Sequence, residues 1–460
     1  MTVRLRLLVV CCVLVPAFAA AQNAPRPDAD PRIEKIVASV SQERLQSLLT
    51  KLVSFGTRNT MSDQESTTRG IGAARNWILE EMRRSSEKLR VNFDTHIIVP
   101  QGRITSQVDL RNVMAILPGR TPRRIYISGH YDSVNIGGQN VSNSAAPAAA
   151  PAAGGGDRQT RPGFDPNVEA NGANDDGSGT VLTMELARVF AESGIQFDAT
   201  LVFITWAGEE QGLVGSNVHA ADLATNKVPI EAVFNNDIVG NSLGGNGFRD
   251  AESVRVYAIG PEDSPARSLA RYIKKAASVY VPSHRIRLMA REDRFGRGSD
   301  QSSLTQNGFP AIVFRESNEN FERQHGPNDK IDGVDFGYLA QNARVNAAGV
   351  ASLALAPPAP KVTNDRGANM LARDPTGYDA AMRWNPSPGA VAYRVYWRDT
   401  WNNDWEFSQT IGNVTQFNLK NVNIDDFAFG VSAISAEGQE SLVSSYVSPV
   451  RQGTPIKRQQ

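Results

Sequence analysis

Arg-Ile-Tyr-Ile-Ser-Gly-His-Tyr-Asp-Ser, residues 124–133, joins a short apolar strand pattern to two polar side chains, His130 and Asp132. Strand patterns of the same kind precede further acidic or imidazole side chains, namely Asp175, Glu209, Glu210, Asp237 and His325. In open α/β sheets, side chains beyond the carboxyl ends of the strands gather at one edge, where ligands bind. The sequence therefore predicts a functional site at that edge.

Helix and strand patterns alternate from Asp30 to about Pro357. Apolar residues repeat with helical spacing at 45–53 and 71–82, and short apolar runs typical of buried strands occur at 199–205 and 309–314. Such alternation is typical of an α/β fold. We expect a three-layer domain over residues 30–356, with helices on both faces of the sheet.

A different pattern follows the proline-rich linker Ala356-Pro357-Pro358-Ala359-Pro360. Apolar and aromatic residues then alternate with period two, as in Tyr393, Val395 and Trp397, which predicts a small all-β sandwich over 358–453. The segment resembles a fibronectin type III domain. Because no catalytic cluster is evident in it, we expect a spacer or attachment role, and a folded enzyme without it.

Composition excludes several classes of function. The 460 residues include 48 basic and 48 acidic side chains, so the chain lacks the positive charge expected of a nucleic-acid-binding protein.

Residues 1–21 have the pattern of a signal peptide: Arg4 and Arg6, an apolar run to Phe18, then three alanines. We expect an exported protein, periplasmic or extracellular, with no stable membrane insertion after cleavage. Both cysteines, Cys11 and Cys12, would be lost with this segment, which excludes disulfides and thiolate ligands.

A low-complexity stretch, residues 137–173, separates His130 from Asp175. It is rich in alanine, proline and glycine, as expected of a loop. Since both of its ends carry candidate ligands, it must start at the rim of the site. A neutral insertion and a substrate-selecting lid are both open interpretations.

The candidate residues have side chains of the types that bind metal ions. Five side chains supply imidazole nitrogen or carboxylate oxygen: His130, Asp175, Glu210, Asp237 and His325. Zinc is bound by such ligands when thiolates are lacking, and a pair of zinc ions is typically bridged by a carboxylate. Asp175 lies in Asn-Asp-Asp-Gly-Ser-Gly, and Glu210 ends Trp-Ala-Gly-Glu-Glu. These motifs, in this order, resemble the co-catalytic zinc aminopeptidases, the family of bacterial leucyl aminopeptidase, over about residues 45–355.

The resemblance implies a role for each residue. His130 and Asp237 would hold one Zn²⁺, Glu210 and His325 a second, and Asp175 would bridge them. Glu209 would be the general base acting on a water that bridges the metals, and Asp132 would orient His130. The resemblance also implies a cis peptide bond after Asp175. Asp329, four residues after His325, is expected to support the ligands.

Some residues leave alternatives open. Relatives often have a histidine after the pair Ser299-Asp300, where this chain has glutamine, and Asp300 could either face the substrate amine or form a structural turn. The run Arg291–Arg294 is interpreted as a solvated loop. The remaining histidines are expected to be surface or packing residues: His96, His219 and His284.

These features together predict an exported two-zinc exopeptidase that removes N-terminal residues from peptides. One alternative is a glutamate-releasing carboxypeptidase, with Arg291, Arg294 and Arg297 as the anchor for an acidic substrate. Glutaminyl cyclases and the transferrin receptor ectodomain share the fold, but the complete ligand set disfavours both. The preferred N-terminal residue and the oligomeric state do not follow from the sequence.

Overall fold

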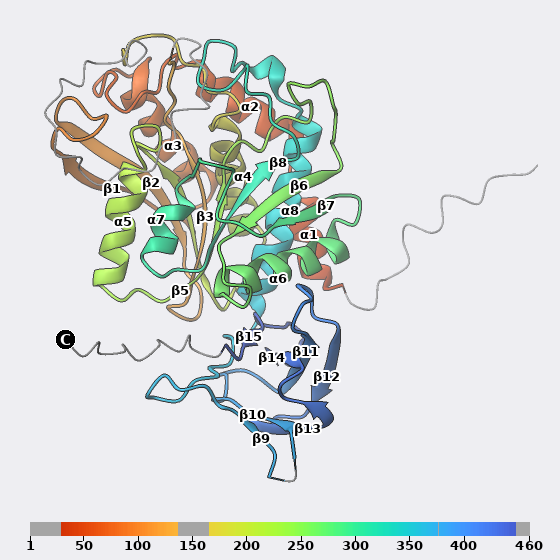
Figure 1. The fold of residues 1–460 in the computed structure, drawn as a ribbon. Coiled ribbons are helices and arrows are strands. Elements are labelled where there is room, and N and C mark those ends of the chain that lie inside the picture. The colour runs from red at the N-terminus through yellow and green to blue at the C-terminus, as the bar shows by residue number, and fades with distance from the viewer. Residues whose placement is uncertain (1–28, 137–164, 376, 448–460) are drawn as a thin grey trace, which may run out of the picture.

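The computed structural model describes residues 29–136, 165–375 and 377–447. The expected signal peptide, most of the low-complexity stretch and the last residues of the sandwich lie outside these ranges. Among the helices in the described ranges, none combines the length and apolar character needed to cross a bilayer. The described chain forms an α/β domain with a smaller β domain against it (Figure 1).

The first domain is built on a mixed sheet of eight strands in the order β1-β2-β4-β3-β5-β8-β6-β7. The strands are β1 (Arg90–Ile98), β2 (Val108–Leu117), β3 (Arg124–His130), β4 (Thr200–Trp206), β5 (Ile230–Asn236), β6 (Ser253–Ala258), β7 (Arg285–Met289) and β8 (Ala311–Glu316). The four central strands β4, β3, β5 and β8 are parallel to one another. Their carboxyl ends therefore meet at a single edge, as the sequence predicts.

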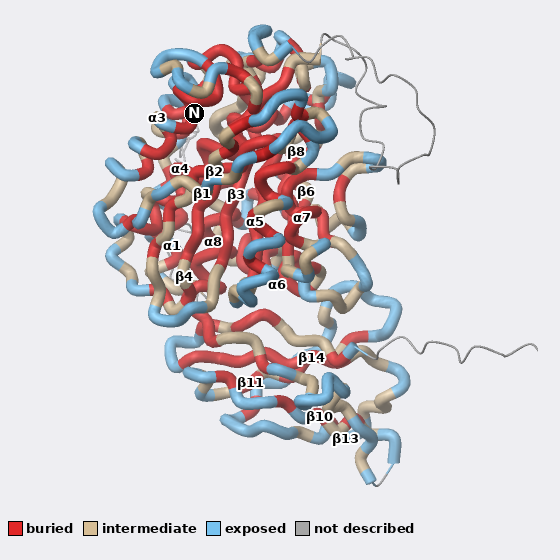
Figure 2. The backbone as a smooth tube through the Cα atoms, turned by 90° about the vertical axis from the view of Figure 1, so that its left-hand side faces the viewer, coloured by how far each residue is buried: buried red, intermediate tan, exposed pale blue. Residues whose placement is uncertain are grey.

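Helices cover both faces of this sheet. They are α1 (Pro31–Ala38), α2 (Gln42–Val53), α3 (Gly70–Ser85), α4 (Gly177–Glu192), α5 (Val214–Thr225), α6 (Pro265–Tyr280), α7 (Gln301–Gln306) and α8 (Phe336–Leu355). Helices α5 and α7 pack on one face, through Ala220, Leu223 and Leu304, and the other six bury the larger core on the opposite face. The backbone of the central strands is buried, while the outer helical surfaces are exposed (Figure 2). The predicted three-layer α/β fold is confirmed.

The second domain contains two antiparallel sheets, of three and four strands, ordered β13-β10-β9 and β12-β11-β14-β15. Its strands are β9 (Leu371–Arg373), β10 (Asp379–Arg383), β11 (Ala392–Asp399), β12 (Phe407–Ile411), β13 (Gln416–Asn423), β14 (Phe427–Ile434) and β15 (Ser444–Ser445). Residues such as Trp384, Tyr393 and Val431 form its own core. The predicted all-β module is present.

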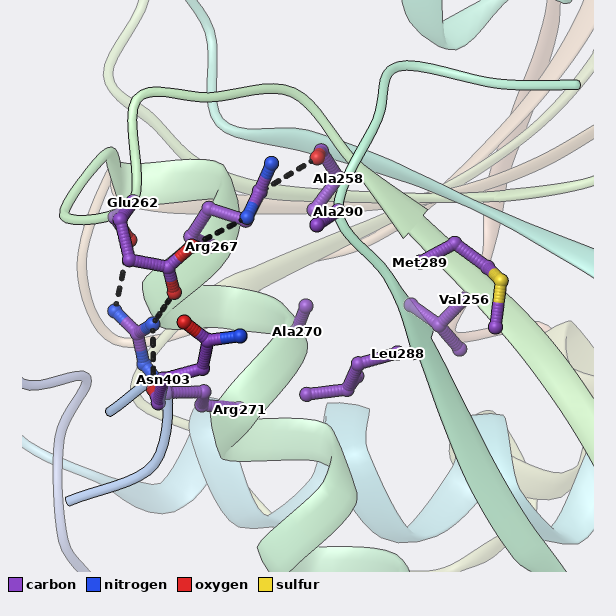
Figure 3. Close-up of a pocket in the computed structure, with 10 residues that line it drawn as sticks. All are labelled: Val256, Ala258, Glu262, Arg267, Ala270, Arg271, Leu288, Met289, Ala290 and Asn403. Atoms are coloured by element: carbon purple, nitrogen blue, oxygen red, sulfur yellow. Dashed lines mark hydrogen bonds and ion pairs between the residues drawn. The ribbon is translucent and has the colours of Figure 1, made fainter. Parts of the chain in front are cut away.

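The β domain is docked closely onto helix α6. Leu442 is buried within the core of the first domain, and Ser268 donates a hydrogen bond to the carbonyl oxygen of Val443 at 2.5 Å. At the same interface between the domains, Arg271 donates a hydrogen bond to the carbonyl oxygen of Asn403. Both residues line a small cavity of about 50 Å³ (Figure 3). These contacts do not fit the expected role of a simple spacer, because removing the β domain would expose part of the first domain's core.

Candidate metal centre

The strand ends place four of the five candidate ligands at one edge. His130 is the last residue of β3, and Asp237 directly follows β5. Glu209 and Glu210 lie in the turn after β4, and His325 lies in the loop after β8. Asp175 differs from the expectation, because it precedes helix α4 and does not end a strand. Its peptide bond to Asp176 is cis, as the resemblance implies.

The carboxylate of Asp175 lies between two imidazoles. Its Oδ1 is 3.3 Å from His130 Nε2, and its Oδ2 is 2.9 Å from His325 Nε2. On the His130 side, Asp237 Oδ1 is 3.8 Å from the same Nε2 atom. On the other side, Glu210 Oε2 is 3.4 Å from His325 Nε2. Two groups of three potential ligands thus share Asp175.

The ligand atoms have the properties expected of a metal site. Three of them are buried without a hydrogen-bond partner in the described part of the chain: His130 Nε2, Asp175 Oδ2 and Glu210 Oε1. Unpaired buried polar atoms are costly and rare in folded proteins, so several that converge require a ligand. Nitrogen and oxygen donors suit zinc. The residues present therefore fit zinc.

Negative charge accumulates at this edge. Burial, together with the charges of Asp237 and Asp300, raises the pKa of Glu209 well above its ordinary value, although His130 opposes the shift. Burial and the charges of Asp175 and Glu209 raise the pKa of Glu210 in the same way. Burial also disfavours the charged form of Asp175, but His325 and His130 hold its pKa well below the ordinary value. Carboxylates that favour protonation in such a cluster indicate a place where bound cations would balance the charge.

Asp132 connects the two halves of the centre. Its Oδ1 accepts the backbone N–H of Glu209 at 3.2 Å, and its Oδ2 accepts that of Glu210 at 3.1 Å. The same Oδ1 lies 3.5 Å from His130 Nδ1. The structure therefore places Asp132 where it can orient both His130 and the Glu209–Glu210 turn, consistent with the predicted supporting role.

Comparison with known proteins agrees with this geometry. Peptidase family M28 matches residues 112–350. The chain belongs to this family. A probable zinc metalloprotease of Leptosphaeria maculans is 34% identical over 452 residues, covering 90% of this chain and 97% of that protein. Another, from Pyricularia oryzae, is 35% identical over 461 residues, covering 91% of this chain and 84% of its own length. This M28 protein is therefore a zinc metallopeptidase.

Solved structures share the fold of this M28 peptidase. The LapA aminopeptidase of Legionella pneumophila aligns with a TM-score of 0.51 and 19% identity, over 70% of this chain and 74% of its own. A glutaminyl cyclase of Porphyromonas gingivalis aligns with a TM-score of 0.51 and 17% identity, over 68% of this chain and 98% of its own. At such identities the likeness concerns the fold alone.

Several residues that support the M28 site are absent from the sequence prediction. Asp176 Oδ2 accepts the backbone N–H of His130 at 2.9 Å, while its Oδ1 accepts those of Gly179 and Ile238. Its place beside Asp175 in the motif is a signal that could have indicated this role. Arg58 donates hydrogen bonds to two backbone carbonyl oxygens, that of Tyr131, which precedes residues 137–164, and that of Gly172, which follows them. No local pattern marks Arg58, because its partners are far away in the sequence.

Asp329 and Asp300 are both buried close to the centre. The carboxylate of Asp329 accepts the backbone N–H groups of Asn174 and Asp175, each at 2.8 Å, as expected of a supporting residue. Asp300 is only 1% exposed. Burial, together with the charges of Asp132 and Asp237, raises its pKa to about 7 against the opposing effect of His130. Asp300 is therefore a buried carboxyl group close enough to influence the charge of Glu209.

The run Arg291–Arg294 fits the expected solvated loop only in part, because Arg291 is exposed whereas Asp293 is buried. The side chain of Arg294 is only 8% exposed and pairs with Glu319 at 2.8 Å and with Asp293 at 3.2 Å. Arg297 lies 3.4 Å from the same Glu319 carboxylate. Mutual neutralisation allows these charged groups to be buried together.

The other three histidines lie outside the metal centre, as predicted. His219 Nδ1 is 2.9 Å from Asp94 Oδ2 and packs against Trp206. His96 pairs with the same aspartate, and His284 contacts the side-chain oxygen of Asn342.

Proposed function

We propose that this M28 peptidase is an exported two-zinc aminopeptidase that releases N-terminal residues from peptides. The observation that supports two ions is the position of Asp175, whose two oxygens face two different imidazoles at 3.3 and 2.9 Å. One carboxylate placed in this way can hold two metals side by side. His130 and Asp237 would complete one position, and Glu210 and His325 the other.

Glu209 is the proposed general base. When bound, zinc supplies Lewis-acid polarisation of a carbonyl group and activation of water. Glu209 belongs to the turn that carries the ligand Glu210, and its Oε2 lies 4.0 Å from His130 Nε2. It can accept the proton of the attacking water and pass it to the leaving amine.

The surroundings of the arginines favour an aminopeptidase over a glutamate-releasing carboxypeptidase. An anchor for an acidic substrate needs an arginine whose charge is available. Arg294 and Arg297, the two arginines of this group with largely covered side chains, are both engaged with Glu319, whereas Arg291 is exposed. The substrate amine would instead be attracted by the excess of carboxylates at the centre, including Glu209.

The direction of cleavage is tested with one peptide in four forms, in which each end is either free or blocked. We expect cleavage only when the N-terminus is free, since acetylation removes the amine's charge and adds bulk. Amidation of the C-terminus should change kcat/KM little. Release of C-terminal residues from the acetylated peptide would support the carboxypeptidase, and cyclisation of an N-terminal glutamine without hydrolysis would support a cyclase.

Export is a separate part of the proposal. It rests on the charged, apolar and small-residue segments of residues 1–21, which have the order found in signal peptides. Fractionation of the producing cell, with N-terminal sequencing of the purified protein, tests this point. Mature protein that begins after Ala21 and lies outside the cytoplasm is the expected result.

A further inference from the structure

Arg315 forms an ion pair with one of the candidate zinc ligands. This arginine lies in strand β8 and is completely buried. Its Nη1 is 2.5 Å from Asp237 Oδ1, and it also donates to the carbonyl oxygen of Asp237 at 3.0 Å. The other terminal nitrogen, Nη2, pairs with Asp293 Oδ2 at 2.8 Å. Arg315 therefore connects the metal centre to a second buried carboxylate.

The arginine contacts the oxygen that faces the metal position. Asp237 Oδ1 is also the atom 3.8 Å from His130 Nε2. A metal held by His130 and Asp237 would share this carboxylate with a guanidinium. One negative charge would then be divided between two cationic partners that repel each other.

The wider network does not cancel the charge of Arg315. Asp293 also pairs with Arg294, and Glu319 pairs with Arg294, Arg297 and Arg255. Including Asp237, the network holds three carboxylates and four guanidinium groups. Within this network, the guanidinium of Arg315 is the charge that contacts the carboxylate of Asp237.

We propose that Arg315 is a positioning residue that weakens zinc binding at the His130–Asp237 position, so that the two ions are held unequally. The inference rests on the proposed two-metal centre and extends it. Arg315 fixes the orientation of Asp237 through its two contacts, while its charge lowers the affinity of the neighbouring position. The Glu210–His325 position is the tighter one.

The test isolates the weaker position and measures zinc affinity without using activity. His325→Ala removes one ligand of the other position and serves as the background. In this background, Arg315→Gln combined with Asp293→Asn removes both charges of the pair but keeps hydrogen-bonding groups. Zinc affinity is then measured by competition with a chromophoric chelator. We expect roughly tenfold tighter binding at the His130–Asp237 position, because removal of a cation beside the bound zinc ion removes a repulsion.

Two further variants distinguish an effect of charge on zinc affinity from an effect of lost structure. Arg294→Gln lowers the charge of the network without touching Asp237, and it should also tighten zinc binding. Arg123→Gln combined with Glu231→Gln removes a buried ion pair whose two members are 2.7 Å apart outside the centre, and it should leave the affinity unchanged. If the double variant at Arg315 is unfolded by circular dichroism, Arg294→Gln decides the question.

The outcomes distinguish this inference from the proposed function. Weaker or unchanged zinc binding in the Arg315 and Arg294 variants would overturn the inference alone, since it would show an ordinary orienting role. A folded His325→Ala protein that binds no zinc would contradict the assignment of the His130–Asp237 position, and with it the two-metal function.

Discussion

Glu209 and Glu210 are neighbours in the chain but have different surroundings. Glu210 is 4% exposed, with Oε2 3.4 Å from His325 Nε2, whereas Glu209 is partly exposed and reaches only to 4.0 Å from His130. Adjacent residues in a turn can direct one carboxylate to a metal and the other to the reacting water. This division of roles can be tested by single substitutions.

We expect Glu209→Gln to reduce kcat by roughly 10²–10⁴-fold while zinc content stays nearly unchanged, because only proton transfer is lost. The matched change Glu210→Gln should reduce zinc content. Steady-state kinetics and elemental analysis of the two purified variants provide the measurement. Loss of zinc in Glu209→Gln, with zinc retained in Glu210→Gln, would reverse the assignment.

At the residue scale, the sequence predicts the side chains that lie in local motifs and misses those that act from a distance. His130, Asp132 and Asp175 are each part of a recognisable pattern. Arg315 and Arg58 are not, because each is defined by partners contributed by segments that are distant in the chain. Arginine is seldom fully buried, so the sequence gives no reason to expect a buried one. Only the folded structure shows which carboxylates neutralise its charge.

At the level of elements, glycines allow helix α4 to approach the sheet closely. A Cβ atom on Gly179 would lie 2.2 Å from the carbonyl oxygen of Asn236, and one on Gly129 would lie 2.5 Å from the carbonyl carbon of Gly179. Both distances are too short for a real contact. The start of α4, just after Asp175, can therefore pack against β3 and β5 only because these positions lack side chains.

Gly179→Ala should consequently destabilise the protein by about 1–3 kcal/mol, the usual cost of overpacking, and should lower zinc content by displacing Asp175. Gly412→Ala is the control, because a Cβ atom there meets nothing within 4 Å. Thermal unfolding and metal analysis would measure both effects. Equal melting temperatures for the two variants would show that α4 can move without cost.

The elements themselves follow from sequence patterns better than their ends do. The apolar runs at 199–205 and 309–314 correspond to β4 and β8, and the helical spacing at 71–82 falls within α3. Asp175 was expected at the end of a strand, but it directly precedes Asp176, the N-cap residue of α4. Hydrophobic periodicity identifies an element without fixing how its ends connect.

At the scale of the whole molecule, Glu440 ties the β domain to the peptidase domain. Its carboxylate pairs with Lys275 of α6 at 2.9 Å and with Arg394 of β11 at 2.9 Å, and it accepts hydrogen bonds from Tyr396 and Ser432. Burial disfavours its charged form, yet Lys275 and Arg394 hold the pKa of Glu440 below its ordinary value of 4.5. The sequence predicts this domain but not its attachment, because the contacts lie on surfaces that have no pattern of their own.

A lowered pKa makes this attachment dependent on pH. The carboxylate stabilises the folded protein above pH 4.5, the ordinary value, and this stabilisation is lost as the pH falls through the lower folded-state pKa. Glu440→Gln should therefore cost about 2 kcal/mol near neutral pH, as for hydrogen bonds to charged groups. The difference from the unsubstituted protein should shrink in acid. Thermal unfolding across this range, with the exposed Glu437→Gln as control, tests the prediction; a difference that is constant with pH would contradict it.

The central claim is that Asp175 lies between two zinc ions. The most direct measurement is anomalous diffraction at the zinc absorption edge from crystals of the active, mature protein. The account predicts two peaks per chain, one between Asp175 and His130 and the other between Asp175 and His325. A single peak in fully active protein, or two peaks that do not flank the Asp175 carboxylate, would contradict it.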